Sequence, residues 1–543
     1  MKTSKTYFYV LFLSLLTPLA VSSCWAVGSG VYQTWSWSIF RLHGMTFDME
    51  CVVDFHGVSY MITVFIVSSM VLMYSVFYMP SVSNNSFFVS LLLFIASMLL
   101  LAMSKSLFWA ILGWDSLGIT SFLLILHFKS WNSTKSAMVT FMSNRVGDVF
   151  IITSTGLLSI SQSSSMCLSL FVLLGATTKS AQFPFSAWLP LAMAAPTPVS
   201  SLVHSSTLVT AGVFLLTRFN SVISGLEWLL VLLSTITLIY SGLSAMFEWD
   251  LKKIVAFSTL SHLSLMVLMI SLGSLYASTL HMVMHATFKS ALFMVTGAMI
   301  SVSADTQDIR LMKFPCGSLA MQSVTYVCLF SMAGLPALSG FYSKELMAQT
   351  SLTPYSALHY LVFLTGVLLT SAYSVRMVVS LSKCSPMTIS NQHLGITSVC
   401  KPPTLMIPVM LMGGSWSSVL VCTSVPLSAD FEYVTATSSL ILLSLMVGCL
   451  VGMAFAKDFT MPLSLRFYNK WAVYSILEGL AALMELVTNS SLCDLEGLNL
   501  RVAMLPSLSM NRLVKWESRL VVQGFIPFKL LIAVITTVLL SLW

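Results

Sequence analysis

Residues 175–212, GATTKSAQFPFSAWLPLAMAAPTPVSSLVHSSTLVTAG, interrupt an otherwise regular series of apolar segments. The stretch puts Lys179 and His204 among apolar residues and contains four prolines, at positions 184, 190, 196 and 198. Each proline lacks a backbone N–H and disfavours helical geometry at the residue before it. A helix that enters residues 175–212, called the opening stretch below, is therefore expected to break.

The composition places the chain in a membrane. Of its 543 residues, 57% are hydrophobic and 8% are charged, whereas soluble domains carry roughly 25% charged residues. Apolar runs long enough to span a bilayer, on the order of 20 residues each, recur along almost the whole length. The pattern predicts an all-α polytopic membrane protein with about 15 transmembrane helices. Its function is therefore expected within or across the membrane.

Charge and cysteine usage exclude several other classes. The net charge of +7 comes from few residues, many of them at helix ends or in loops, which suits anchoring at the membrane surface and not nucleic-acid binding. The ten cysteines are scattered without a C-x-x-C pair. They therefore signal neither a disulfide framework nor a zinc or iron–sulfur ligand set. Any redox centre is expected to belong to another chain.

The first apolar run, residues 7–27, is longer than the usual signal-peptide core of about 7 to 15 residues and is interpreted as a retained span. Residues 28–54 form a polar connection whose tryptophans suit the membrane interface. Further spans are predicted at 59–79, 86–104, 107–127, 137–158, 166 into the opening stretch, 198–218, 226–246, 253–272, 277–301, 320–342, 355–380, 404–424 and 436–455.

A second interruption, SMAGLPALSGFYSKEL, occupies residues 331–346 and carries Lys344 and Glu345. Two long apolar segments, each broken by proline or glycine and each carrying a lysine, are typical of a transporter built from inverted repeats. The chain shows no letter-by-letter repeat. Two ordinary loops that bound shorter helices are the alternative.

The composition of the sequence changes after the predicted span at 436–455. Residues 457–523 mix charged and apolar residues, as in KWAVYSILEGLAALMELV, which predicts an amphipathic helix lying along a surface. An apolar run at 525–543 predicts a final anchor. The expected division is into 1–106, N-terminal helices; 107–380, antiporter-like core; 381–456, additional helices; 457–524, lateral helix; and 525–543, C-terminal anchor.

Ionisable residues inside the spans are the candidate functional residues, because a charge near mid-membrane costs a few kcal/mol. They are Asp115, Lys179, His204, His281, His285, Lys289, Lys344 and Glu345. His281, His285 and Lys289 are four residues apart, which places them along one helix face with a rise of about 6 Å per step. Zinc binding by the His-x-x-x-His pair is one alternative, although no third ligand is evident. Simple polar packing between helices is another.

Two charge pairs are expected in the first half of the chain. Asp115 and Lys179 lie on different predicted helices and are plausible partners, because neither charge should be buried alone. Arg145 and Asp148 are three residues apart and could pair within one helix. Opening such a pair at about 4 Å changes the energy by about 4 kcal/mol at an effective dielectric near 20. That is similar to the cost of moving one proton across roughly 150 to 200 mV.

The motifs resemble those of a known family. Seven motifs are similar, in the same order, to those of the antiporter-like chain 5 family of mitochondrial NADH–ubiquinone oxidoreductase, respiratory complex I. They are the opening stretch, LGWDSLGITSFLLI, SNRVGDVF, DLKKIVAFSTLSHLSLM, HMVMHATFKSALFMVTGAM, DTQDIRLM and GLPALSGFYSKEL. The resemblance covers roughly residues 50 to 380. Beyond it, the C-terminal region resembles the family's lateral helix and anchor in layout.

The resemblance implies a proton-translocating subunit of the mitochondrial inner membrane that performs no redox chemistry. Asp115 falls where the family has an acidic partner, Lys179 where it has the pumping lysine of the first half, and Lys344 with Glu345 at the exit-side pair. His204, His281, His285 and Lys289 fall on the hydrated central axis. NADH, FMN, iron–sulfur clusters and ubiquinone would be handled by other subunits. The implied partners are complex I subunits, especially the antiporter-like chains 4 and 2, and membrane lipid.

The sequence departs from the family pattern at three places. Only one clear span precedes the Asp54 region, where many relatives have two. His262 stands where relatives commonly have glutamine, and Asp115 is shorter than the glutamate of many members. A subunit of an Mrp-type cation/proton antiporter is the main alternative, and a structural scaffold is a third, which would leave the buried lysines and histidines unexplained. The predicted surface helix and anchor favour the complex I subunit, because they make sense only beside a row of partners.

Overall fold

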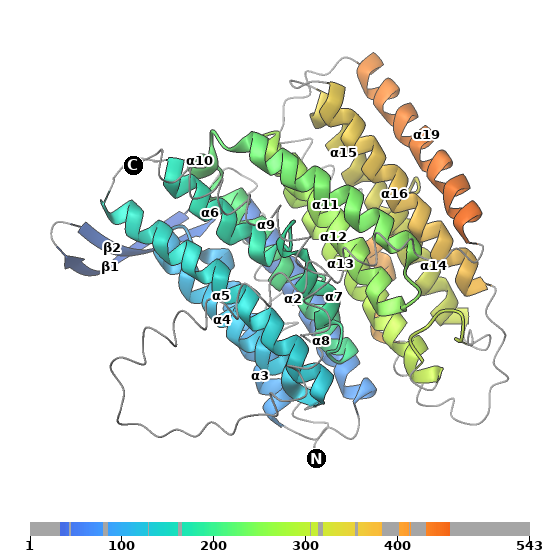
Figure 1. Cartoon of the computed structure of the whole chain (residues 1–543), viewed down its shortest axis with the longest axis horizontal. Coiled ribbons are helices and arrows are strands. Elements are labelled where there is room, and N and C mark those ends of the chain that lie inside the picture. The colour runs from blue at the N-terminus through green and yellow to red at the C-terminus, as the bar shows by residue number, and fades with distance from the viewer. Residues whose placement is uncertain are drawn as a thin grey trace, which may run out of the picture. The chain divides into compact units, whose positions relative to one another are not determined.

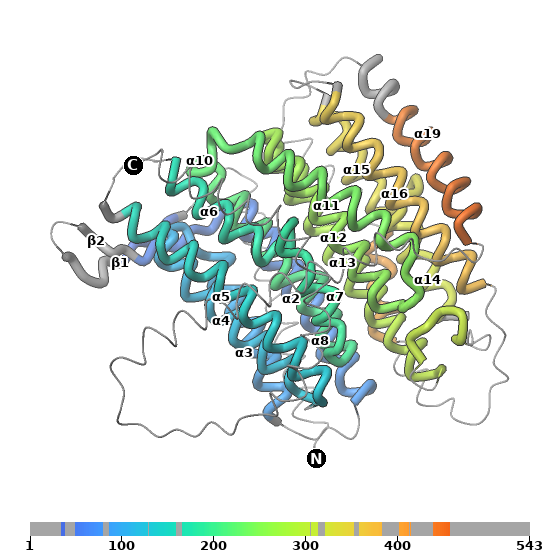
Figure 2. The backbone as a smooth tube through the Cα atoms, viewed as in Figure 1, coloured from blue at the N-terminus to red at the C-terminus, as the bar shows by residue number. Residues whose placement is uncertain are grey.

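The structure is a computed structural model that describes residues 33–42, 45–79, 85–128, 130–160, 166–303, 306–312, 319–352, 357–382, 401–411, 413 and 431–456. These residues belong to one compact unit, Met1–Glu478. Figures 1 and 2 show long helices that lie side by side, with one small hairpin at an end of the first helices.

The hairpin is a difference from the all-α expectation. Strands β1 (Gln33–Leu42) and β2 (Met45–Val53) pair antiparallel within the region predicted as a polar connection. Their sequences are rich in Trp, Phe, Val and Thr, which fit a pleated surface better than a helix. An ion pair of 2.9 Å between Lys105 and Glu50 ties the hairpin to the segment before α4.

Four helices follow the hairpin. They are α2 (Phe55–Tyr78), α3 (Asn85–Met103), α4 (Leu107–Ile125) and α5 (Trp131–Ile160). Asp54 caps α2, because its carboxylate accepts a 3.0 Å hydrogen bond from the Gly57 N–H. Helix α4 packs between α3 and α5 (Figure 1). Large apolar side chains of α3, α4 and α5 remain exposed, as expected for helices that face lipid or a partner.

The opening stretch breaks twice. The first break follows its prolines, as predicted, whereas the second lies inside the span predicted at 198–218 and was not predicted. Helix α6 (Met166–Lys179) ends at Lys179 itself, and the chain continues as η2 (Phe185–Ala187) and α7 (Trp188–Ala192). Helices α8 (Thr197–Val203) and α9 (Leu208–Arg218) are separated by a second break at residues 204–207. Both breaks are buried, so the backbone leaves helical geometry inside protein and not against lipid.

The next helices form the interior of the unit. The short helix α10 (Asn220–Ile223) leads to α11 (Glu227–Phe247), α12 (Leu251–Ser271) and α13 (Leu275–Val302). Helix α12 packs against both α11 and α13. Almost every residue of α12 and α13 is buried, so their histidines and lysine point into protein.

The second interruption also breaks a helix. Helix α14 (Leu319–Ala333) ends before Gly334, whose φ of 88° suits glycine, and α15 (Ser339–Leu352) begins after a short turn. A Cβ on Gly340 would lie 1.8 Å from the Ser331 carbonyl oxygen, so glycine lets the two halves approach closely. Helices α16 (Ala357–Ser382) and α19 (Phe431–Phe455) pack against each other beside this break (Figure 1).

Nine helical segments in the described ranges are long and apolar enough to cross a membrane. Their positions agree with the spans predicted between residues 55 and 382 and with the span at 436–455. The predicted span at 7–27, the lateral helix at 457–524 and the anchor at 525–543 lie outside the described residues. The chain is therefore a multi-pass membrane protein, and its full number of spans stays a prediction.

Candidate functional site

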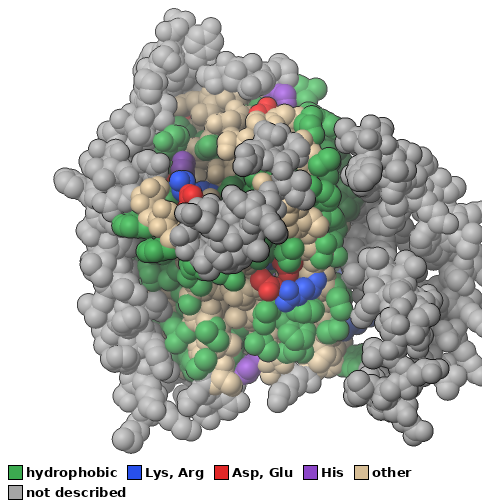
Figure 3. Space-filling view, turned by 90° about the vertical axis from the view of Figure 1, so that its left-hand side faces the viewer, with side chains coloured by type: hydrophobic (Ala, Val, Ile, Leu, Met, Phe, Trp, Pro, Cys, Tyr) green, Lys and Arg blue, Asp and Glu red, His purple; other side chains and the backbone are tan. Residues whose placement is uncertain are grey.

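A charged cluster joins α4 and α5. Arg145 contacts the Asp115 carboxylate through Nη1, and the same nitrogen lies 3.2 Å from Oδ2 of Asp148. The pairing of Arg145 with Asp148 within one helix is thus confirmed. Asp148 is buried, whereas the side chains of Arg145 and Asp115 are 34% and 40% exposed. Figure 3 shows one face of the molecule, where hydrophobic side chains lie beside small groups of acidic, basic and histidine side chains.

Lys179 lies at the first break and is completely buried. Its ammonium donates to the Trp114 carbonyl of α4 and lies 3.9 Å from the centre of the Trp114 ring. The ring face supplies a cation–π contact that partly replaces lost hydration. Trp188, on the far side of the break, donates from its indole N–H to the Thr178 carbonyl at 3.0 Å.

The predicted direct pair between Asp115 and Lys179 does not form. Arg145 occupies the Asp115 carboxylate instead, and the lysine donates to the carbonyl of the residue next to that aspartate. The error has a physical reason, because the choice between two cations for one carboxylate depends on how α4, α5 and α6 pack. Asp148 and Asp115 remain close enough to act electrostatically on Lys179.

His204 lies at the second break, where it ends α8. It is buried, its ring lies 6.2 Å from that of Trp188, and its Nδ1 has no hydrogen-bond partner among the described residues. Tyr60 of α2 holds the following turn, since its hydroxyl donates to the Ser206 carbonyl at 3.0 Å. The break therefore has a fixed shape and an imidazole nitrogen left without a protein partner.

The three-residue ladder on α13 faces inward, as its spacing predicted. His281, His285 and Lys289 are all completely buried. His281 contacts the Ser343 hydroxyl at 2.9 Å through Nδ1. His285 lies beside Ser205 of the second break, so the ladder meets both halves of the chain.

Lys289 and Lys344 converge on one residue of α14. The Lys289 ammonium lies 2.5 Å from the Ser258 hydroxyl and 3.1 Å from the Met332 sulfur. Lys344 reaches back across the second interruption and donates to the carbonyls of Met332 and Ala333 at 2.9 and 2.8 Å, and to the Thr370 hydroxyl at 2.9 Å. A cation at these carbonyls also suits the negative end of the helix dipole of α14.

Glu345 does not pair with Lys344. Adjacent residues on a helix point about 100° apart, and Lys344 is buried while Glu345 is only half buried. The resemblance implied an acidic partner for this lysine, but no ion pair joins the two residues in the described part of the chain. Neutral oxygens take that place.

Sequence reasoning left His262 out of the site. It lies on α12, completely buried, with its Nδ1 3.1 Å from the Nε2 of His281 and its ring 5.6 Å from that of His285. Its position was a usable signal, because Ser258 and His262 are four residues apart on one helix face and a histidine inside a span is rare. Within the described ranges, no group of three or more His, Cys, Asp or Glu side chains is arranged so that it could hold a metal ion.

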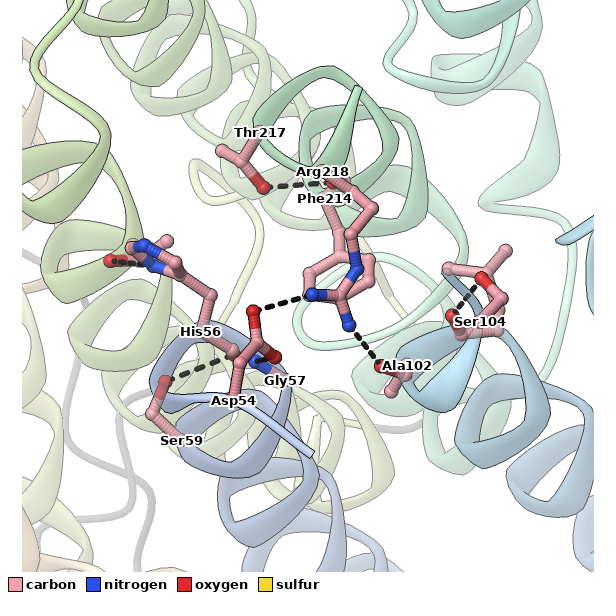
Figure 4. Close-up of polar contacts among 11 residues, drawn as sticks. Asp54, His56, Gly57, Ser59, Ala102, Ser104, Phe214, Thr217 and Arg218 are labelled. Carbon is pink, nitrogen blue, oxygen red and sulfur yellow. Dashed lines mark hydrogen bonds and ion pairs between the residues drawn. The ribbon is translucent and has the colours of Figure 1, made fainter. Parts of the chain in front are cut away.

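A second charged group went unpredicted and lies at the end of the unit near the hairpin (Figure 4). Arg218, the last residue of α9, lies 2.5 Å from the Asp54 carboxylate and donates to the Ala102 carbonyl at 3.1 Å. His56 contacts Thr279 at 3.3 Å. The group therefore ties α9 to α2 and α3, and α2 to α13. Its partners are 164 residues apart in sequence, so no local pattern could pair them.

The fold and the buried lysines define the class of protein. Residues 104–370 match a family model described as NADH:quinone oxidoreductase/Mrp antiporter, a transmembrane family. Among solved structures, a chain of an Mrp complex from a Dietzia species is 23% identical with a TM-score of 0.70 over 96% of this chain and 61% of its own. An archaeal membrane-bound sulfane sulfur reductase chain is 16% identical with a TM-score of 0.65, over 82% of this chain and 94% of its own. The fold is that of an antiporter-like membrane subunit.

Curated relatives narrow the class. The chain is 40% identical over 397 residues to NADH-ubiquinone oxidoreductase chain 5 of Aedes aegypti, covering 69% of this chain and 68% of the mosquito protein. It is 37% identical over 431 residues to that of Lumbricus terrestris, covering 75% and 73%. It is 46% identical over 322 residues to that of Artemia franciscana, covering 57% and 59%. The chain belongs to the NADH-ubiquinone oxidoreductase chain 5 family.

Proposed function

We propose that this chain is a membrane-arm subunit of respiratory complex I that carries protons across the mitochondrial inner membrane. Membership of the chain 5 family supports this function over the Mrp-type alternative, because the Mrp likeness is one of fold. NADH oxidation and ubiquinone reduction, with FMN, the iron–sulfur clusters and ubiquinone, belong to other subunits. The scattered cysteines of this chain agree with that division.

The observation that carries the proposal is the set of three buried lysines that form no ion pair within the described part of the chain. Lys179, Lys289 and Lys344 are each at most 1% exposed, and each ammonium is held by carbonyl, hydroxyl, ring or sulfur atoms. A directly paired carboxylate would hold the lysine in its charged form. Neutral partners leave each nitrogen free to take up and release a proton. Proton transfer across a membrane requires groups that can take up and release a proton at several depths, and the three lysines are such groups.

The proton path runs from α4 to α15. It starts at Asp115, Arg145 and Asp148, continues through Lys179 to His204 across Trp188, and reaches His285 beside Ser205. His262 and His281 then lead to Ser343, the neighbour of Lys344. Water in the two breaks would complete the gaps, since non-helical backbone at membrane depth either is buried in protein or lines a water-filled cavity.

Lys289 and Lys344 form the exchange point of the second half. Both contact Met332, the first through its sulfur and the second through its carbonyl. Because two ammonium groups so placed repel each other, a proton that arrives on one favours the departure of a proton from the other. Repulsion of this kind couples the protonation of the two lysines without a carboxylate partner.

The two broken segments are corresponding parts of two inverted repeats within residues 107–380. Each repeat has a helix broken near a lysine, with Lys179 at the end of α6 and Lys344 opposite the end of α14. The pattern of paired broken helices supports this arrangement. The N-terminal helices at 1–106 and the additional helices at 381–456 flank this core.

Partner subunits cover α4 and α5. The Asp115 and Arg145 side chains lie near the middle of their spans yet are 40% and 34% exposed. Charges at that depth are costly against lipid, so a protein surface belongs there. We assign it to a neighbouring antiporter-like chain, chain 4 or chain 2, with residues 457–524 lying laterally along the row and 525–543 as an anchor.

Replacing Lys289 tests the proposal. Lys289→Met keeps the side-chain volume but removes the proton-carrying nitrogen. Proton transfer through this subunit should slow by roughly 10²–10⁴-fold, so proton transport per NADH oxidised by the complex should fall. The measurement is proton uptake by proteoliposomes that contain the assembled complex, normalised to NADH oxidation. Lys105→Met, in an exposed ion pair near the hairpin, is the matched control. Normal transport by an assembled Lys289→Met complex would contradict the proposal.

A further inference from the structure

A cavity of about 710 Å³ opens between the ends of several helices. Its walls come from the end of α2, the beginning of α5, the connection from α7 to α8, the beginning of α12 and the end of α13. All of these are ends of membrane-crossing segments, so the cavity lies at the level where hydrocarbon gives way to water. The hairpin and the Asp54 group lie at the opposite ends of α2 and α4.

Positive charge dominates the polar part of the cavity. Lys135, Lys252 and Lys253 line it against a single acid, Asp250. Asp250 is occupied by an ion pair with Lys253. Lys135 is exposed and has no ion-pair partner in the part of the chain that the structure describes. Lys252 is only 7% exposed although it lines the cavity, with its ammonium 3.5 Å from the Ala195 carbonyl.

The beginning of α12 adds to this positive field. Asp250 is the N-cap residue of this 21-residue helix, but its carboxylate makes no capping hydrogen bond. The helix dipole therefore directs its positive end toward the cavity without a side-chain acceptor at the cap. The amides of Asn132 and Gln307 provide further hydrogen-bonding groups on the wall. The positive charges and hydrogen-bond donors of the cavity wall are together suited to bind a phosphate group.

The remaining wall is apolar. Phe128, Leu191, Met193 and Ile300 line it beside the lysines, and Trp131, which is 73% exposed, stands next to the start of α5 as interfacial aromatic residues do. A small inorganic anion has no apolar part that could pack against such a surface. A glycerophosphate group with acyl chains would use both parts of the wall.

We propose that this cavity binds the phosphate headgroup of an anionic phospholipid. Lys135 and Lys253 contact the phosphate, and the apolar wall receives the glycerol and the first part of an acyl chain. Basic pockets between membrane helices recognise anionic headgroups in this way, with a contribution that corresponds to about a fivefold change in affinity per lysine. None of the residues assigned to the proton path lines the cavity, and the inference does not depend on the proposed function.

Lysine footprinting of the whole complex tests the site without a mutation. The wild-type complex is placed in nanodiscs of phosphatidylcholine alone or with phosphatidylglycerol, treated with an amine-acetylating reagent and analysed by mass spectrometry. Phosphatidylglycerol should lower the acetylation of Lys135 and Lys253 several-fold and leave the exposed Lys105 unchanged. Equal acetylation of Lys135 in both nanodiscs would overturn the proposal. Equal protection by inorganic phosphate in phosphatidylcholine nanodiscs would also overturn it, because the occupant would then be a free anion.

A variant provides the second readout. The Lys135→Gln, Lys253→Gln complex should retain fewer molecules of phosphatidylglycerol in native mass spectrometry than the wild type, with proton transport per NADH unchanged at saturating lipid. Lys105→Gln is the matched control, at the opposite end of the helices. Retention equal to that of the wild type and the control would count against the site.

Discussion

At the scale of single residues, two arginines and three buried lysines differ in the groups that they contact. Arg145 and Arg218 each contact a carboxylate, and both arginines link helices. The buried lysines 179, 289 and 344 are held by neutral groups instead. Arginine stays charged at all accessible pH values, whereas lysine can lose its proton. Arg145 and Arg218 therefore suit structural links, whereas the three buried lysines suit the proton transfer proposed above.

The Arg218 and Asp54 pair should contribute measurably to stability. Arg218→Gln leaves the Asp54 carboxylate partly buried without its partner, which should cost about 1–3 kcal/mol. The side chains are 10% and 23% exposed. Thermal unfolding or limited proteolysis of the purified complex measures the loss. Lys105→Gln breaks an exposed pair and should change stability by about 0.5 kcal/mol or less; equal effects of the two substitutions would mean that the Arg218 pair has no special weight.

Lys344 and Glu345 should differ in their importance for proton transport. Lys344 bridges the second interruption, whereas Glu345 is half buried and makes no ion pair with it. Lys344→Met should slow proton transfer through this subunit by roughly 10²–10⁴-fold and so lower proton transport per NADH, while Glu345→Gln should leave proton transport per NADH close to that of the wild type. Proteoliposome measurements on both assembled variants decide the matter. A loss of transport in Glu345→Gln would instead support the acidic partner that the resemblance implies.

At the scale of elements, glycines set how closely helices approach. Gly448 and Gly452 of α19 are four residues apart and face α16, where a Cβ would lie 1.8 Å from the Ser371 hydroxyl oxygen or 2.3 Å from the Ala372 carbonyl oxygen. Small residues at this spacing let the backbones of membrane helices come together. The same device brings α9 against α6, since a Cβ on Gly212 would lie 2.6 Å from the Ala176 carbonyl oxygen.

Adding one methyl group should separate α19 from α16. Gly448→Ala should destabilise the complex by about 1–3 kcal/mol, because overpacking forces the backbones apart. Gly156→Ala in α5 is the matched control, as nothing lies within 4 Å of its added Cβ, and it should be neutral or slightly stabilising. Thermal stability of the two complexes provides the comparison. An unchanged melting temperature for Gly448→Ala would show that this helix contact is loose.

At the scale of the whole molecule, the surface of the unit Met1–Glu478 is suited to contact with lipid and with other subunits. The faces of α4, α5 and α19 expose large apolar side chains, and α4 and α5 add a charged pair at mid-span. Lipid can cover the first kind of surface but not the second. The protein is therefore expected to complete its structure only within the assembled complex.

Truncation after Ala456 should weaken assembly. The change removes residues 457–524, predicted as a lateral helix, and residues 525–543, predicted as an anchor, and with them the contacts proposed along the row of partners. The truncated subunit should be depleted from the complex at least several-fold on a native gel stained for NADH dehydrogenase activity. Truncation after residue 524, which removes the anchor alone, separates the two contributions. Normal comigration after the longer truncation would show that the core binds its partners without them.

The sequence by itself determined the membrane class, most span positions, both interrupted segments and the inward ladder on α13. These follow from local causes, namely hydropathy, proline chemistry and the 3.6-residue period of a helix. Only the tertiary structure decided that Asp115 pairs with Arg145, that His262 joins the histidines and that Arg218 meets Asp54. Helix packing makes these choices, because it brings together side chains that, in these three pairs, are 19 to 164 residues apart in the sequence.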